Sequence, residues 1–170
     1  SLQLSRSLGD RIGEPKVLLV LSRLELLSGR LAKAEEHVLA GQILADRERM
    51  RREAAIADEY LGDVLLARGE HEAAILNYEL GLEKIRPLGR VSDVEGELLR
   101  RRAEARRQAG DPAGAVADAH AAVAVCEECG EVYELGFCHL TLGEAYAASS
   151  DWAQADAHFR QASEIFQGQH

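Results

Sequence analysis

The sequence predicts an all-α protein made of four antiparallel helix hairpins, because one pattern of small residues returns four times along the chain. The pattern places a small residue in each first helix and another twelve positions later, at Ser22, Gly62, Ala103 and Gly143 and at Ala34, Ala74, Ala115 and Ala155. Both series have separations of 40, 41 and 40 residues, which places an inserted residue in the connection 86–89. A repeat of this length is typical of an α-solenoid, in which each hairpin packs only against its neighbours.

Composition also favours packed helices over a sheet protein. Apolar residues make up 46% of the chain and aromatic residues only 5%, while alanine, leucine, glutamate and arginine are frequent. No stretch alternates as a strand would, and no apolar run approaches the roughly 18 residues that span a bilayer. We therefore expect a soluble, cytoplasmic protein that makes no membrane contact.

The hairpins are expected at about 15–50, 51–89, 90–130 and 131–167, inside a repeat domain that covers 15–170. Residues 1–14 are expected to be the end of a preceding helix. The first helix of the domain contains KVLLVLSRLELL, which is apolar on nearly every side and needs additional cover. This predicts a homodimer contact through Leu19, Val20 and the open ends of the array.

Two glycines of the second hairpin are expected to have structural roles. Gly69 suits the left-handed residue that ends a helix, and Gly62 lies mid-helix, where glycine costs about 1 kcal/mol relative to alanine. A close approach of the partner helix beside Ala74 would account for Gly62. The third hairpin is irregular, because Arg102 and Arg106 stand where the neighbouring second and fourth units have leucine or tyrosine. Either these arginines snorkel or this hairpin is the least stable link.

The second and fourth units carry a resemblance to a known repeat. The matching positions are a leucine-glycine pair and then aromatic residues and alanines, at Leu142, Gly143, Tyr146, Ala155, Phe159 and Ala162 and at Leu61, Gly62, Ala74 and Tyr78. This pattern resembles the tetratricopeptide repeat (TPR) over about residues 15–167. The family repeat is commonly about 34 residues, so the additional residues are expected between the hairpins. Long repeats of this kind are similar to those of bacterial transcriptional regulators of the LuxR-like and MalT-like types.

The resemblance implies a right-handed superhelix whose first helices line a concave groove that binds peptides or proteins. Carried over by position, the groove would present Lys16 and Leu19 together with the expected partner-binding residues Arg23, Glu59, Asp63, Glu97, Arg100, Glu104, Arg107, Phe137, Leu140 and Glu144. The arginines at 100 and 107 could offer bidentate contacts to a partner carboxylate beside two apolar anchors. Alternatively, Glu104 simply pairs with Arg100 on an exposed face.

These observations predict a protein- or peptide-binding module without catalytic activity, expected to be the regulatory segment of a larger bacterial transcriptional regulator. Two alternatives stay open: a ligand-sensing domain that binds a small molecule or signalling peptide, and a self-associating structural scaffold. The formal net charge of −9 argues against nucleic-acid binding. Two arginine-rich runs, at 46–53 and 100–107, contain glutamates at helical spacing and are expected to form solvated pairs rather than phosphate-binding patches.

Metal, cofactor and catalytic sites are not expected. Cys126 and Cys129 have C-x-x-C spacing and Cys138 follows, but a closed zinc site needs four convergent ligands, so these cysteines are interpreted as packing residues. His71 is followed by no second zinc-protease histidine, and the six histidines stand at no ligand spacing. His139 is expected to be a packed, hydrogen-bonded histidine.

Overall fold

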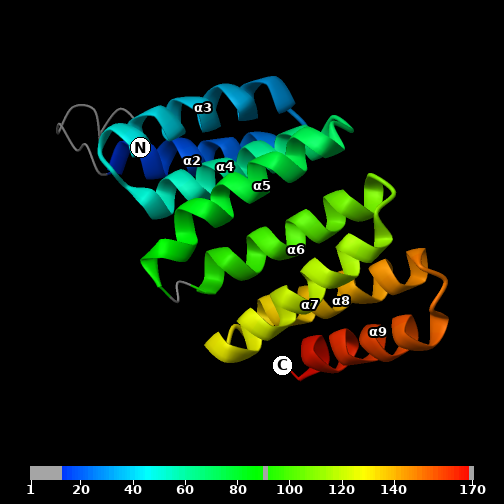
Figure 1. The fold of residues 1–170 in the computed structure, drawn as a ribbon. Helices are drawn as coiled ribbons and strands as arrows, with labels where there is room; N and C mark the ends of the chain where they lie inside the picture. Colours follow the sequence, from blue (N-terminus) through cyan, green and yellow to red (C-terminus); the bar gives the residue numbers. More distant parts are fainter. Residues whose placement is uncertain (1–12, 90–91, 169–170) are drawn as a thin grey trace. The chain divides into compact units, whose positions relative to one another are not determined.

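The computed structural model describes residues 13–89 and 92–168, so the helix end predicted at 1–14 lies outside the described residues except for its last two. The helices are α2 (Gly13–Leu27), α3 (Leu31–Arg47), α4 (Arg51–Ala67), α5 (His71–Ile85), the 3-10 helix η1 (Arg86–Leu88), α6 (Ser92–Gln108), α7 (Pro112–Cys129), α8 (Val132–Ala148) and α9 (Trp152–Gln167). The helices form antiparallel hairpins as the pairs α2–α3, α4–α5, α6–α7 and α8–α9 (Figure 1). The predicted all-α fold of helical hairpins is confirmed. In the described ranges, none of the helices combines the length and apolar character needed to cross a bilayer.

The chain divides into two compact units, Ser1–Leu88 and Gly89–His170, which we call unit 1 and unit 2. In unit 1 the hairpin α2–α3 stacks on α4–α5, and in unit 2 the hairpin α6–α7 stacks on α8–α9. The boundary between the units follows η1, in the connection where the repeat spacing predicts the inserted residue.

The long repeat lengthens helices instead of loops. Within unit 1 the hairpins are joined by 48–50, and within unit 2 by 130–131. Links this short leave no room for the roughly six residues by which the repeat exceeds a 34-residue TPR. The additional residues are therefore helical, and α7 reaches 18 residues.

Local sequence signals set the hairpin turns. Gly69 has φ +79°, as predicted for the left-handed residue after α4. Asp111 caps α7, because its side chain accepts a hydrogen bond from the Gly114 amide and Pro112 follows at the helix start. Two turns place other residues in the left-handed region, Arg49 with φ 57° and Ser150 with φ 64°. Side chains with a Cβ adopt this conformation at some cost, so tertiary packing holds these turns.

The mid-helix glycines make room for aromatic rings of the partner helix. A Cβ on Gly62 would lie 2.5 Å from the Tyr78 ring, and one on Gly143 would lie 2.6 Å from the Phe159 ring. The predicted close approach is confirmed, but the neighbour that requires it is the ring of Tyr78 and not Ala74. Glycine is needed because any side chain would displace a ring that is already packed.

The cores combine the small residues with a few large ones. Leu19 of α2 packs with Val38 and Ala57 in unit 1, while Ala103, Ala119 and Leu142 form a cluster in unit 2. Leu19 is only 4% exposed, so it is not available on a surface as the groove and dimer predictions assumed. Val20, which is 59% exposed, is the residue of that pair through which a dimer contact remains predicted.

Candidate functional site

In unit 1 the predicted groove residues brace the first helices against each other. Arg23 of α2 donates a 2.8 Å hydrogen bond to Asp63 of α4, and its guanidinium lies 5.3 Å from the centre of the Tyr60 ring. The Tyr78 hydroxyl donates to the other Asp63 oxygen, also at 2.8 Å. Asp63 is 8% exposed and Glu59 only 2%. Asp63 therefore joins α2 to α4 and α4 to α5, while Arg23 keeps 31% of its side chain exposed.

Beside this brace, α2 and α4 enclose a shallow hollow with a volume of about 200 Å³. Its lining combines apolar side chains with charged ones, at Lys16, Leu19, Val20, Arg52, Glu53, Ile56 and Tyr60. Lys16 lies 3.4 Å from Glu53 across the two helices. We call this the α2–α4 hollow. The sequence pointed to Lys16 and Leu19 but not to Ile56 and Tyr60, although the spacing of four residues puts these two on one side of α4.

In unit 2 the arginines of α6 pair with the next first helix, α8. Arg100 is 8% exposed, hydrogen-bonds Glu134, and lies 5.5 Å from the centre of the Phe137 ring. Arg107 lies 3.3 Å from Glu144. The alternative that Arg100 pairs with Glu104 on an exposed face is wrong, because Arg100 is buried and turns to α8. Charged residues within each unit thus join neighbouring hairpins.

The other groove residues predicted in unit 2 differ in exposure. Glu97 and Glu104 are half-buried on α6, and Glu104 accepts a 3.2 Å hydrogen bond from Gln108. Leu140 is 36% exposed. Phe137 packs edge-on against Tyr133 at 5.1 Å and Phe166 at 5.2 Å. The aromatic anchor expected in the groove is therefore largely covered by other rings of its own unit.

The irregular arginines of the third hairpin have an acidic partner that the sequence interpretation missed. Arg102 binds both oxygens of Asp118 on α7, at 2.8 and 2.6 Å, and Arg106 lies 3.3 Å from the same carboxylate. Asp118 is 5% exposed, so this cluster replaces the leucine contacts of the other units with ion pairs. The sequence feature that could have indicated this partner is Asp118 itself, which precedes Ala119 and stands at the repeat position where the second unit has the uncharged Asn77.

Histidines far apart in the sequence meet in unit 2. His139 Nδ1 lies 3.2 Å from His158 Nδ1, and the Tyr146 hydroxyl lies 2.8 Å from His120 Nε2. The His158 ring stacks on both His139 and Tyr146. Burial lowers the pKa of His139 and of His158, neighbouring histidines lower both pKa values further, and Glu127 opposes the shift at His139. His139 is packed and hydrogen-bonded as predicted, but its partner was not foreseen.

The two cysteines that lie close together are not the two with C-x-x-C spacing. Cys126 and Cys138 are buried with their sulfurs 3.7 Å apart, whereas Cys129 is half-buried and apart from this pair. The hydrogen bond between Cys138 and Cys126, together with burial, raises the pKa of the Cys138 thiol. Across the described residues, no three histidine, cysteine or acidic side chains are placed to share a metal ion.

The arginine-rich run at 46–53 is not a single helical segment. It spans the end of α3, the turn 48–50 and the start of α4. Arg47 pairs with Glu48 at 3.0 Å. Arg49 lies in the turn and Arg51 is the first residue of α4, and neither has an ion-pair partner among the described residues. The expectation of solvated pairs at helical spacing therefore fails for these two arginines, because the turn separates them from the acids of either helix.

Comparison with solved structures identifies the fold. BtubC (BKLC) from P. vanneervenii is 20% identical with a TM-score of 0.80, over 94% of this chain and 65% of that one. TPR-like repeats of a putative kinesin light chain from Podosopora anserina are 16% identical with a TM-score of 0.68, over 94% of this chain and 78% of theirs. A variant form of the latter is 15% identical with a TM-score of 0.72, over 96% and 81%.

The fold is TPR-like. At 20% identity and below, these likenesses concern the architecture alone, and this chain spans 65% of the length of BtubC. The sequence matches no family model and no curated protein. The TPR interpretation of the fold is therefore confirmed, while the kinship with bacterial transcriptional regulators stays a prediction.

Proposed function

We propose that this chain is a non-enzymatic module that binds a protein or peptide segment, and that the α2–α4 hollow is its principal contact. The observation that carries this proposal is the combination of one exposed apolar side chain, Val20, with half-buried apolar side chains and cations in one hollow. Val20 is 59% exposed there, beside Ile56 and the Tyr60 ring. An apolar contact that a partner can bury, rimmed by charges, is what a peptide-binding surface requires.

The charges around the hollow favour an acidic partner segment. Lys16 keeps 57% of its side chain exposed, and Arg52 lines the same hollow. Glu53 is the acid there, and Lys16 already faces it. A segment with one apolar anchor and a flanking carboxylate would bury Val20 and meet a cation, which gives both affinity and register.

We propose that a surface of unit 2, formed by Arg107, Leu140 and Glu144, makes a smaller contribution to partner binding. Arg107 and Glu144 keep 29% and 41% of their side chains exposed, and Leu140 lies beside them on α8. Arg100 is buried against Glu134, so it would position this surface rather than contact a partner. The placement of the chain within a larger transcriptional regulator, and the ligand-sensing alternative, remain predictions that rest on the TPR resemblance alone.

The test is selection from a random peptide library on the purified chain, followed by fluorescence anisotropy of the selected peptides. We expect them to share an apolar residue flanked by acids and to lose affinity about tenfold or more for Val20→Asp. Val20 is exposed, so this variant should keep its fold. The matched control is Ile43→Asp on α3, because Ile43 is 67% exposed and does not line the hollow. Equal losses for both variants, or none for Val20→Asp, would refute the assignment.

A further inference from the structure

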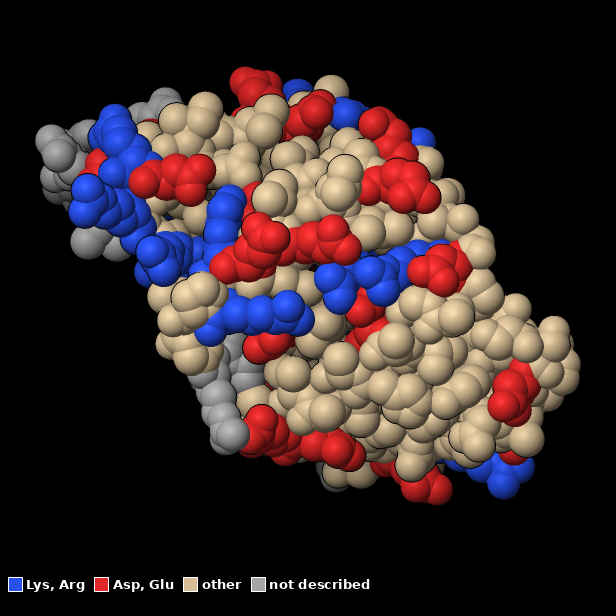
Figure 2. All heavy atoms as spheres, in the orientation of Figure 1, with Lys and Arg blue, Asp and Glu red and all other residues tan. Residues whose placement is uncertain are grey.

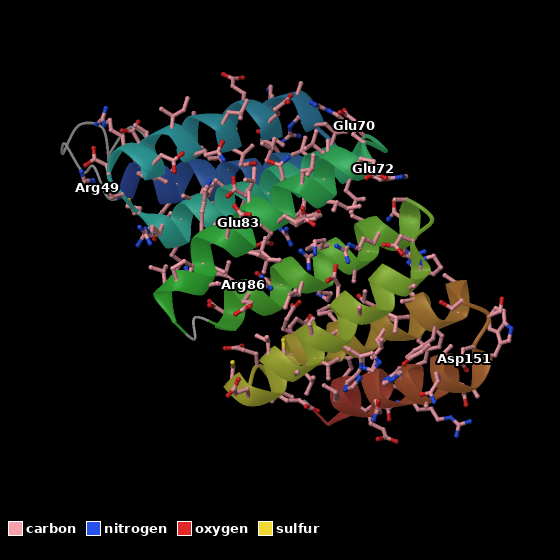
Figure 3. All side chains as sticks on the ribbon, in the orientation of Figure 1. Arg49, Glu70, Glu72, Glu83, Arg86 and Asp151 are labelled. Atoms are coloured by element: carbon pink, nitrogen blue, oxygen red, sulfur yellow. The ribbon has the colours of Figure 1, made fainter. Side chains whose placement is uncertain are left out.

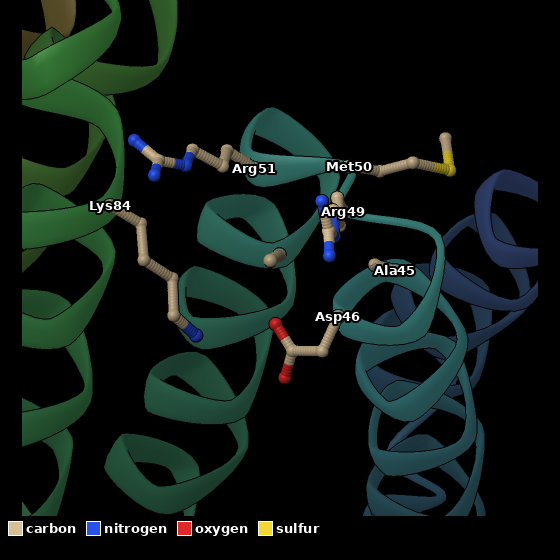
Figure 4. A pocket seen from close by; sticks show the side chains of 7 residues that line it. Ala45, Asp46, Arg49, Met50, Arg51 and Lys84 are labelled. Atoms are coloured by element: carbon tan, nitrogen blue, oxygen red, sulfur yellow. The ribbon is translucent and has the colours of Figure 1, made fainter.

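A second hollow in unit 1, which we call the basic pocket, lies where α3, α4 and α5 meet (Figure 4). Its volume is about 460 Å³, within the range of small-molecule sites. Three cationic side chains line it: Arg49 from the turn, Arg51 from the start of α4 and Lys84 from α5. Asp46 is the one acidic residue in the lining. The pocket shares no lining residue with the α2–α4 hollow.

The cations of the basic pocket are not neutralised by its own walls. Arg49 and Arg51 form no ion pair with any residue in the described ranges. Lys84 is 2.7 Å from Asp58, a carboxylate that is completely buried and also accepts a 2.6 Å hydrogen bond from Gln42. One ammonium proton directed at Asp58 leaves two for the pocket, so Lys84 is held in place but can still donate.

Basic side chains gather at one end of unit 1. Figure 2 shows lysine and arginine side chains gathered over the α3–α4 turn. In Figure 3, Arg49 stands at this end of the hairpins, while Glu70 and Glu72 stand at the other, by the α4–α5 turn. The whole chain carries −9, so two arginines without an ion-pair partner in the described ranges, next to Lys84 in one hollow, are a local exception. Their mutual repulsion would be relieved by a bound anion.

We propose that the basic pocket binds a small organic phosphate monoester. Two arginine forks and an ammonium suit a phosphate dianion, since guanidinium groups bind phosphate oxygens in pairs. Ala45, Ala54 and the stem of Met50 supply an apolar wall for the organic part of the ligand. Asp46 can accept a hydrogen bond from a ligand hydroxyl, and its charge would direct the phosphate towards the arginines and away from this carboxylate. The site goes beyond peptide binding and would give the chain a ligand-responsive element separate from its peptide surface.

The experiment is isothermal titration calorimetry of the purified chain with phenyl phosphate and inorganic phosphate. We expect one site per chain, with phenyl phosphate binding more tightly because it also covers the apolar wall. Arg51→Gln and Arg49→Gln should each weaken phenyl phosphate about tenfold or more. The control is Arg47→Gln, which removes a nearby exposed cation that pairs with Glu48 and does not line the pocket. Circular dichroism melting verifies that each variant is folded.

Three results would overturn this inference. The first is absence of phenyl phosphate binding at millimolar concentration by the unmodified chain. The second is an equal loss for Arg47→Gln, because it would reduce the effect to general attraction by a basic surface. The third is a phosphoserine peptide that binds more tightly than phenyl phosphate through Arg49 and Arg51, because it would assign the pocket to a protein ligand.

Discussion

Replacing Gly62 with alanine tests the packing that defines the hairpin. The added Cβ would lie 2.5 Å from one Tyr78 ring carbon and 2.8 and 2.9 Å from two more. Tyr78 is completely buried, and its hydroxyl is held by Asp63 at 2.8 Å, so the ring has no vacant direction in which to move. Relief therefore requires that the helices separate or that this hydrogen bond break.

The magnitude follows from three opposing terms. Alanine gains about 1 kcal/mol of helix propensity over glycine. Overpacking costs about 1 to 3 kcal/mol, and loss of a hydrogen bond to the Asp63 carboxylate costs about 1.5 to 3 kcal/mol. If both costs apply, the net loss in the free energy of unfolding is about 1.5 to 5 kcal/mol. The larger Gly62→Leu should destabilise still more.

Urea denaturation followed by circular dichroism measures this loss. Gly41→Ala is the matched control, because its Cβ would lie 3.3 Å from Leu18 and Leu19, a tight contact but far less severe than 2.5 Å, so it should cost clearly less than Gly62→Ala. Gly62→Ala placed on a Tyr78→Leu background should cost little, since the ring that blocks the Cβ is gone. Equal stability of Gly62→Ala and the unmodified chain would refute the packing argument, as would an undiminished cost on the Tyr78→Leu background.

Three further outcomes are expected. Asp118→Ala should lower the free energy of unfolding by about 3 kcal/mol in urea denaturation, because it leaves two arginines without their shared acceptor; Asp118→Asn should recover part of this loss. Stability should fall as pH drops through about 6.5, because burial lowers the folded-state pKa of His139 and His158, so the unfolded chain binds more protons there; a pH series of melts should show a smaller fall for His158→Gln. If the chain dimerises, sedimentation should show that Val20→Glu is monomeric; unchanged association would exclude this surface.

The sequence alone determined the hairpins. Helix type, the left-handed turn at Gly69 and the cap at Asp111 follow from interactions within a few residues, which the amino acid types specify directly. The repeat also predicted how the two helices of a hairpin align, because equivalent positions such as Gly62 and Gly143 must make the same contact with the partner helix. Even so, the sequence interpretation chose Ala74 as the neighbour of Gly62, since spacing predicts which helices meet but not which side chain fills the space between them.

Only the tertiary structure decided what the charged residues do. The chain offers acids at helical spacing everywhere, so Arg100 could have paired within α6, yet its partner is Glu134 on α8. The same holds for Lys84, which reaches the buried Asp58 and thereby completes a basic pocket with residues of the α3–α4 turn. An ion pair depends on where two long side chains meet between helices and on how far each is shielded from water. Local sequence records neither quantity, whereas helix packing fixes both.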